Sequence, residues 1–220
     1  MTPYYQDDYC TIYHGDCRDI LPSLPKVDLV LTDPPYGING ASGNVNVLRG
    51  KANYSGVFAD TPEYIETVVI PIISLCIKKA TGVAVTTGIR CLHLYPPCDS
   101  FGCFYQPSAT GMQVFGFVDS QPILYYGRNP TLKNMGKRLS HLMVHVDRNT
   151  DHPCPKPIQE WKKIMANCSL EQQTILDPFM GSGTTLRAAK DLRRKCIGIE
   201  IEEKYCEIAV KRLRQEVLAL

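Results

Sequence analysis

The sequence predicts an α/β protein built on a doubly wound, mostly parallel sheet. Along its 220 residues, short apolar runs of strand length alternate with segments of helical periodicity, as expected for a parallel sheet covered by helices on both faces. Hydrophobic residues make up 44% of the chain and charged residues 21%, which supplies a core and excludes disordered and fibrous classes. The length indicates one domain, residues 1–220, with at most a small inserted segment.

We expect neither a membrane span nor a signal peptide in this chain. Its apolar runs fall short of the about 20 residues that a spanning helix needs. Its first residues, MTPYYQDDYC, lack the basic patch and apolar stretch of a secretory signal. We therefore expect a soluble, cytoplasmic protein without a membrane partner, whose ten cysteines are reduced and partly buried. Cys91, His93, Cys98 and Cys103 lie close together without zinc-site spacing, so no metal is expected.

Five apolar runs are predicted to form parallel strands: residues 11–14, 27–32, 82–86, 174–177 and 195–200. The expected helices are a short one ending near Leu21, followed by 61–80, 156–168, 183–192 and 202–218. Thr61 and Pro62 have the residue types that begin a helix. Pro71 should kink or break that helix, because proline removes a backbone donor.

Two stretches do not follow the alternating pattern. Residues 37–60 are rich in Gly, Asn and Ser, which predicts a long mobile loop, and such loops in compact domains are usually functional. Residues 99–150 hold only short β-like pieces among Pro and Gly, at 101–106, 113–118 and 122–126. This second stretch is the candidate inserted segment.

The charge of the chain is nearly balanced but unevenly spread. Lys and Arg number 24 against 22 Asp and Glu, a net charge of +2. Residues 127–163 carry eight Lys or Arg against three acids, which favours a local phosphate-binding face that includes Lys133, Lys137 and Arg138. An ordinary solvated surface explains the same composition equally well.

A glycine turn (residues 178–183) separates a predicted strand from a predicted helix near the end of the chain. Gly181 and Gly183 let the backbone pass close to a ligand without a Cβ clash. Glu200 ends the next strand, 23 residues after Asp177, and an acid at about that distance suits the two hydroxyls of a ribose. The pattern predicts a cofactor that contains a nucleoside.

The residues around the turn narrow the choice of cofactor. A nucleoside-triphosphate loop would need lysine after Gly183, where this chain has Thr184. A dinucleotide fingerprint would need a third glycine, where this chain has Leu186. Asp177 beside the turn suits a cationic ligand, so S-adenosylmethionine, with its sulfonium, ammonium and ribose groups, fits better.

A second motif, Asp33-Pro34-Pro35-Tyr36, follows the apolar strand 27–32, where open α/β sheets bind ligands. An exocyclic amino group of a base is a poor nucleophile because its lone pair is delocalised into the ring. The Asp33 carboxylate and the Pro34 carbonyl could accept its two N–H groups and stabilise the positive charge that develops during attack. Pro35 makes the segment rigid, and the Tyr36 ring offers a stacking surface for the base.

Together the two motifs resemble those of amino-methyltransferases that modify DNA bases. Their order along the chain is similar to that of the circularly permuted β group of N6-adenine and N4-cytosine DNA methyltransferases. Further matches are Gly15-Asp16-Cys17, the His152–Pro157 segment that resembles His-Pro-x-x-Lys-Pro, and Ile197–Glu200 followed by Tyr205. The resemblance covers residues 11–36 and 152–212 well, 61–90 loosely and 91–150 hardly at all.

The resemblance implies a fold of the S-adenosylmethionine-dependent methyltransferase (Rossmann-like) type, circularly permuted, with a short target-recognition insertion in 99–150. It implies that Asp33, Pro34, Pro35 and Tyr36 hold a flipped base. It implies that the cofactor lies among these residues: Asp16, Cys17, Lys156, Asp177, Phe179, Gly181, Ser182, Gly183, Thr184 and Glu200. Cys154 and Pro155 replace the Thr-Gln more common in the family, which puts the polar contacts of that segment in doubt.

The resemblance also implies DNA as partner and favours adenine N6 as the target, since Asp in the first motif position mostly accompanies adenine. N4-cytosine transfer and a non-catalytic nucleic-acid-binding module stay open. A covalent cytosine mechanism is rejected because Pro97-Cys98 and Pro153-Cys154 do not follow an apolar strand. Small stand-alone members of the family are often encoded by phages or prophages, and we also allow for a homodimer.

Overall fold

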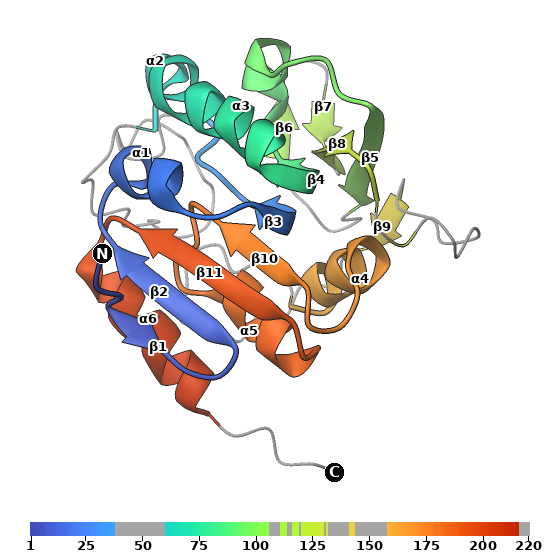
Figure 1. Ribbon diagram of the computed structural model, residues 1–220. Helices are drawn as coiled ribbons and strands as arrows, with labels where there is room; N and C mark the ends of the chain where they lie inside the picture. The colour runs from blue at the N-terminus through green and yellow to red at the C-terminus, as the bar shows by residue number, and fades with distance from the viewer. Residues whose placement is uncertain are drawn as a thin grey trace.

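The computed structural model describes residues 1–37, 60–105, 111–113, 116–118, 120–129, 131, 141–143 and 158–215. Within these residues the main sheet has nine strands, in the order β1-β2-β11-β10-β3-β4-β8-β5-β9 (Figure 1). The strands are β1 Tyr5–Gln6, β2 Cys10–His14, β3 Val27–Thr32, β4 Ala80–Thr86, β5 Ser100–Tyr105, β8 Ser120–Gly127, β9 His141–Met143, β10 Thr174–Asp177 and β11 Lys195–Glu200. The hairpin of β6 (Gly111–Gln113) and β7 (Gly116–Val118) forms a separate small sheet.

The centre of the sheet is parallel and its edges are partly antiparallel. Neighbours from β2 through β11, β10 and β3 to β4 all run parallel. The strand β8 runs antiparallel to both β4 and β5, and β1 runs antiparallel to β2. This confirms the doubly wound, mostly parallel sheet expected from the sequence.

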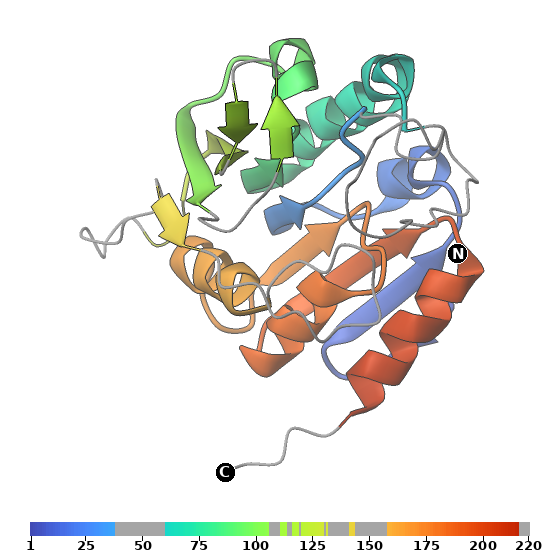
Figure 2. The same cartoon turned by 180° about the vertical axis from the view of Figure 1, so that it is seen from behind.

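Helices cover both faces of the sheet (Figures 1 and 2). Over one face lie α1 (Cys17–Ile20), α2 (Pro62–Tyr64) and α3 (Ile70–Lys79), with an apolar core that includes Leu21 and Ile73. Over the other face lie α4 (Ile158–Cys168), α5 (Thr184–Asp191) and α6 (Glu203–Arg214), whose core includes Trp161 and Leu186. None of the helices in the described parts of the chain has both the length and the apolar character of a membrane span.

The helix predicted for residues 61–80 is irregular. Thr61 caps its start by accepting from the backbone N–H of Tyr64, as the sequence predicted. Residues Ile65–Val69 then form a π-helical turn, and the regular helix α3 begins at Ile70, directly before Pro71. The expected disturbance is therefore present, but it is a wide turn on the N-terminal side of the proline, which has no N–H to bond backwards.

The less regular middle of the chain differs most from expectation. The single strand predicted for 113–118 is wrong, since residues 111–113 and 116–118 are the two arms of the β6–β7 hairpin. A 3-10 segment at Ile89–Leu94 and the short strands β1 and β9 were not predicted. The described parts of 99–150 place β5, β8 and β9 in the main sheet. The nine described cysteines are free, and seven of them are buried.

The sheet changes its winding direction between β10 and β3. These two strands are parallel neighbours, but β10 continues through α5 to β11 and β3 continues through α3 to β4, on opposite sides of the sheet. The following helices therefore lie on different faces, and sheets of this kind usually bind their ligands outside the carboxyl ends of two such strands. Asp33 and Asp177 stand at these two ends.

Candidate functional site

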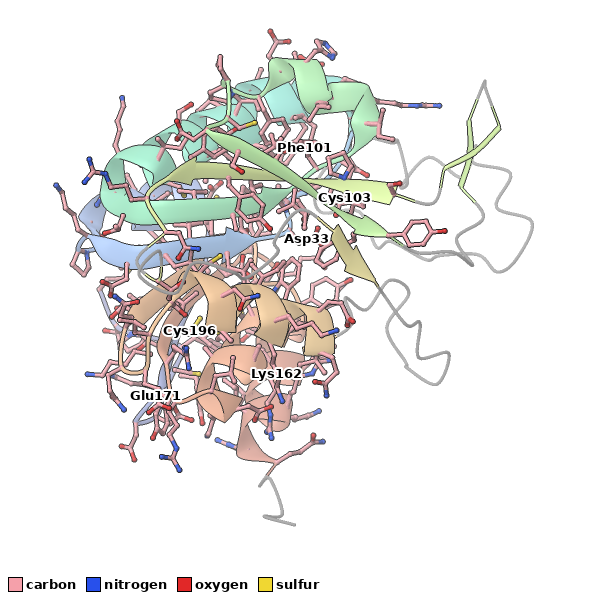
Figure 3. All side chains as sticks on the ribbon, turned by 90° about the vertical axis from the view of Figure 1, so that its right-hand side faces the viewer. Asp33, Phe101, Cys103, Lys162, Glu171 and Cys196 are labelled. Carbon is pink, nitrogen blue, oxygen red and sulfur yellow. The ribbon has the colours of Figure 1, made fainter. Side chains whose placement is uncertain are left out.

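The first half of the site, called the base half here, consists of Asp33, Tyr36, Thr86 and Gln121. The Tyr36 hydroxyl and the Thr86 hydroxyl both donate to the same oxygen of Asp33, Oδ1. The side-chain amide of Gln121 donates to the Tyr36 oxygen. Burial and the neighbouring Asp33 raise the pKa of the Tyr36 hydroxyl, which keeps it a proton donor. Asp33 is labelled in Figure 3, where in projection it lies between the labelled Cys103 of β5 and Lys162 of α4.

The second half of the site, called the cofactor half here, is the glycine turn together with Glu200. The turn is closed by a bond from the Gly183 N–H to the Met180 carbonyl (2.9 Å) and is tied to β11 by the Met180 N–H on the Ile199 carbonyl (3.1 Å). The Glu200 carboxyl accepts from the N–H groups of Gly181 (3.0 Å) and Glu202 (2.8 Å). Burial raises the pKa of Glu200 to about 7.

The two glycines of the turn have different surroundings. Both have positive φ, +51° at Gly181 and +81° at Gly183, a conformation that favours glycine. A Cβ on Gly183 would lie 2.7 Å from the Cβ of Ala209, so this glycine is needed for close packing of the turn on α6. A Cβ on Gly181 would meet no atom within 4 Å. The space beside Gly181 is therefore open.

Asp177 joins the two halves. It is only 2% exposed, and its Oδ1 accepts from the Thr32 hydroxyl (2.7 Å) and from the Phe179 N–H (3.1 Å), while its Oδ2 accepts from the Thr185 hydroxyl (2.5 Å). Thr32 is the residue before Asp33. Burial raises the pKa of Asp177 to about 6. Asp33, from early in the chain, and the glycine turn, from late in the chain, therefore lie at the same end of the parallel strands. The interpretation of the two sequence motifs required this.

Asp16 and Cys17 lie at the end of the neighbouring strand β2. The N–H of Gly15 bonds to the Glu200 carbonyl (2.9 Å), which brings this segment beside the cofactor half. Asp16 caps α1 and pairs with Arg18 (2.5 Å). Cys17 is buried, and burial raises the pKa of its thiol to about 12. Asp16 is thus the more accessible of the two for a polar contact with a ligand.

Several expected site residues lie outside the described residues. These are Lys156 of the cofactor set, the basic residues Lys133, Lys137 and Arg138, and most of the 37–60 loop. Their expected roles stay predictions.

The structure also reveals site residues that the sequence reasoning missed: Thr32, Thr86, Gln121, Trp161 and Thr185. The indole N–H of Trp161 donates to the Thr185 hydroxyl (2.6 Å), which in turn holds Asp177. The sequence could have indicated Thr32 and Thr86, because each is a polar residue at the carboxyl end of an otherwise apolar parallel strand. Ligands bind at that end of such sheets. Gln121 had no such signal, since its strand is antiparallel and lies in the segment that was hardest to interpret.

Comparison with known proteins identifies the family to which this chain belongs. A family model for DNA methylases, N6_N4_Mtase, matches residues 95–211. The chain belongs to this family. The match corrects one expectation, because it includes most of 91–150, the stretch in which the sequence motifs showed hardly any resemblance.

Curated relatives of this DNA methylase support the same assignment. The type II methyltransferase M.ScaI of Streptomyces caespitosus is 26% identical over 262 residues, covering 99% of this chain and 86% of the relative. The type II methyltransferase M.HinfI of Haemophilus influenzae is 45% identical over 258 residues, covering 93% of this chain and 68% of the relative. This protein is therefore a DNA methyltransferase of the amino-group type, and DNA is its substrate.

Solved structures show the same fold. The M1.HpyAVI–SAM complex matches with a TM-score of 0.65 and 23% identity, covering 92% of this chain and 99% of that one. PvuII DNA methyltransferase, described as cytosine-N4-specific, matches with a TM-score of 0.73 and 16% identity, covering 99% and 90%. The sheet is of the S-adenosylmethionine-dependent methyltransferase type.

Two of the structural neighbours, M1.HpyAVI and TTHA0409 of Thermus thermophilus, are complexes with S-adenosylmethionine, and the cofactor half of this chain has the groups to hold that molecule. The open space beside Gly181 allows close approach of a ligand to the turn backbone. The Glu200 and Asp16 carboxylates suit hydroxyl and cationic groups, the donor and charge types that this cofactor carries. The residues present therefore fit the cofactor.

Proposed function

We propose that this chain methylates the exocyclic N6 amino group of adenine in DNA after flipping the base out of the helix. One observation carries the proposal. Asp33 directly follows Thr32, the last residue of β3, and the Thr32 hydroxyl donates to Asp177, which directly precedes the glycine turn (2.7 Å). The proposed acceptor for the amine and the proposed cradle for the methyl donor thus lie at the carboxyl ends of two adjacent parallel strands, where the sheet changes its winding direction.

The base half supplies the groups that amine methylation needs. In the proposed reaction the Asp33 carboxylate and the Pro34 carbonyl accept the two N–H groups of the target amine. Localising the nitrogen lone pair in this way strengthens the nucleophile, and the carboxylate stabilises the positive charge that develops on nitrogen. Pro34 and Pro35 hold the segment rigid, and the Tyr36 ring gives the base a stacking surface.

The cofactor half would hold the methyl donor. Glu200 would accept from the ribose hydroxyls, Asp16 and Cys17 would border the adenine, and the backbone of Gly181–Thr184 with Phe179 and Lys156 would surround the rest. Asp177 would act on the cofactor through the turn that it anchors. When bound, S-adenosylmethionine supplies an electrophilic methyl group. The remaining task of the chain is to exclude water and align the amine, and alignment of this kind contributes strongly to rate.

Adenine is favoured over cytosine because Asp occupies the first position of the Asp33–Tyr36 motif. The order of the motifs along the chain supports membership of the permuted β group. N4-cytosine transfer is the second candidate, since both amines can use the same two acceptors and one structural neighbour is described as cytosine-N4-specific. A cytoplasmic location in a bacterial or phage-infected cell stays a prediction.

The deciding experiment uses PCR-amplified DNA, which carries no methyl groups before the assay. The protein is incubated with this DNA and methyl-labelled S-adenosylmethionine, and the DNA is digested to nucleosides and separated. Label in N6-methyl-2′-deoxyadenosine supports the proposal. Label in N4-methyl-2′-deoxycytidine would replace it with the second candidate, and the absence of label from both would assign the chain a non-catalytic binding role.

DNA contacts outside the crevice are proposed for the basic segment 127–163 and for the loop 37–60, which would close over the flipped base. Flipping costs a few kcal/mol, which such contacts would help to offset. Replacing Lys133, Lys137 and Arg138 by alanine should weaken DNA binding equally for all sequences and reduce its salt dependence, measured by fluorescence anisotropy. Unchanged binding would remove these residues from the DNA contact surface.

A further inference from the structure

The base half contains two side chains, Thr86 and Gln121, that neither the motif nor the glycine turn includes. Thr86 ends β4 and Gln121 lies near the start of β8. In register, Thr32 pairs with Val85, so Thr86 is level with Asp33. Thr86 in turn pairs with Ile123 of β8, two residues after Gln121. Three adjacent strands therefore present these side chains at one place, which fixes them relative to one another.

The hydrogen bonds around Asp33 have a defined direction. An amide nitrogen can only donate, so the bond from Gln121 makes the Tyr36 oxygen an acceptor. The single proton of Tyr36 is then directed to Asp33 Oδ1, while the Thr86 oxygen lies farther away, at 3.3 Å. The Thr86 hydroxyl donates to the same Oδ1, with the Thr32 carbonyl as its more distant acceptor at 3.4 Å.

The hydroxyls of Tyr36 and Thr86 thus both donate to Asp33 Oδ1, and the Gln121 amide fixes the direction in which the Tyr36 hydroxyl donates. Donors that meet on Oδ1 determine both the rotation of the Asp33 side chain and the plane of its carboxylate. The position of the Tyr36 ring is set by the same bonds, because its hydroxyl is held between Gln121 and Asp33. Thr86 is fully buried, so this arrangement is protected from competing water on the β4 side.

We infer that Thr86 and Gln121 are positioning residues for methyl transfer, which hold the Asp33 carboxylate and the Tyr36 ring in the geometry that the target amine requires. The inference rests on the proposed function and extends it to two residues on neighbouring strands. Neither residue needs to touch the amine. Misplacing a reacting group by about 1 Å can cost about 100-fold in rate, so loss of these bonds should reduce turnover more than binding.

The test compares isosteric variants of each residue with the same change elsewhere. Thr86→Val removes the hydroxyl and keeps the shape, Thr86→Ser restores the hydroxyl, and Thr81→Val makes the same change at an exposed position of the same strand. Gln121→Leu removes the amide, and Gln6→Leu on exposed β1 is its control. For each protein we would measure kcat and KM with DNA, cofactor affinity by calorimetry, and the melting temperature.

Thr86→Val should lower kcat by about 10- to 100-fold and Gln121→Leu by about 10-fold, with KM and cofactor affinity changed by less than about 2-fold. Thr86→Ser should recover most of the turnover, and both controls should resemble wild type. If Thr86→Val does not fold, Gln121→Leu decides, since that residue is partly exposed and tolerates change better.

Turnover of both variants within about 2-fold of wild type would overturn the positioning role. The positioning role would also be overturned if turnover fell only in proportion to the melting temperature and the cofactor affinity. Failure of the wild-type protein to methylate DNA would overturn the proposed function instead, so the two failures are distinguishable.

Discussion

Two aspartates at the ends of neighbouring parallel strands have opposite environments. Asp177 ends β10, is 2% exposed and accepts three bonds from protein donors. Asp33 follows β3, is partly exposed and is held on one oxygen by two hydroxyls. The sheet places both at the same end of two adjacent parallel strands, so the difference comes from their neighbouring side chains and not from the strand arrangement. Asp177 therefore holds the β10 end and the turn together, whereas the partly exposed Asp33 is the aspartate that we propose receives the substrate amine.

The two halves of the site also differ in how the chain assembles them. The glycine turn and Glu200 belong to one continuous β10–α5–β11 segment, and its closing bonds are mostly backbone bonds. The base half draws Asp33, Thr86 and Gln121 from segments far apart in the sequence and joins them by side-chain bonds. The cofactor half should therefore tolerate loss of a base-half side chain.

The largest expected effect tests this independence at Asp33. Asp33→Ala should lower methyl transfer by about 1,000-fold or more, because it removes the negative charge that stabilises the positive charge developing on the amine. Cofactor affinity should stay within about 3-fold of wild type, since the bonds that close the glycine turn come from Asp177, Met180 and Glu200. Radiolabel transfer and titration calorimetry measure the two quantities on the same preparation.

A loss of cofactor affinity as large as the loss of transfer would show that the two halves form one coupled unit. The matched control is Asp28→Ala, also on β3, whose carboxylate accepts from the Thr174 N–H at the opposite end of the strand (2.8 Å). That change should affect stability and leave the chemistry of transfer intact.

The contrast between local and distant assembly explains what the sequence could predict. The strands β10, β11 and β3 have the predicted bounds, because each is a short apolar run that ends at a turn or an acid. The spacing from Asp177 to Glu200 placed two acids beside one turn, since a β-α-β unit fixes the geometry between them. Motifs that fold as local units can be interpreted without knowledge of the rest of the sheet.

The contacts of the base half could not be derived in this way. Gln121 reaches Tyr36 only because β8 inserts antiparallel between β4 and β5, and no local pattern around residue 121 encodes that strand order. The hairpin β6–β7, which was predicted as one strand, lies between β5 and β8 along the chain and forms a separate small sheet. The order of the strands in this region depends on which strand edges remain unpaired once the central strands have formed the sheet, which is a property of the whole sheet.

An intermediate effect should appear in the pH dependence of stability, and it belongs to the cofactor half. Glu200 has an ordinary pKa of 4.5 that burial raises to about 7 in the folded protein. Between these values the folded chain keeps a proton that the unfolded chain releases, so the free energy of unfolding must fall as pH rises from about 4.5 to about 7. The contribution of Glu200 is on the order of 3 kcal/mol, and Asp177, raised to about 6, acts in the same direction.

Urea unfolding of the cofactor-free protein at a series of pH values measures this contribution. Glu200→Gln should flatten the fall in that interval, and the difference between wild type and variant isolates the residue from other groups. Glu171→Gln, the same change on an exposed turn, should run parallel to wild type because water surrounds that side chain in both states. Parallel profiles for wild type and Glu200→Gln would contradict a raised pKa of the buried Glu200 carboxyl.

The smallest expected effect separates the two glycines of the turn. Gly183→Ala should destabilise the fold by about 2 kcal/mol, because a positive φ costs about 1 kcal/mol for alanine and the new Cβ contacts Ala209 at 2.7 Å. Gly181→Ala incurs only the backbone cost, about 1 kcal/mol, since nothing lies within 4 Å of its Cβ. The new methyl group of Gly181→Ala instead projects into the open space beside the turn. For the same loss of stability, Gly181→Ala should therefore weaken cofactor binding more than Gly183→Ala does.

A double variant tests the steric part of this difference. Ala209→Gly removes the atom that the new Cβ of Gly183→Ala would contact, so the two changes together should destabilise by less than the sum of the single changes, measured by urea unfolding. Combined with Gly181→Ala, the same Ala209→Gly change should be additive because no contact is shared. Additivity in both pairs would mean that backbone conformation alone selects glycine at 183, and that the packing of the turn on α6 leaves room for a side chain.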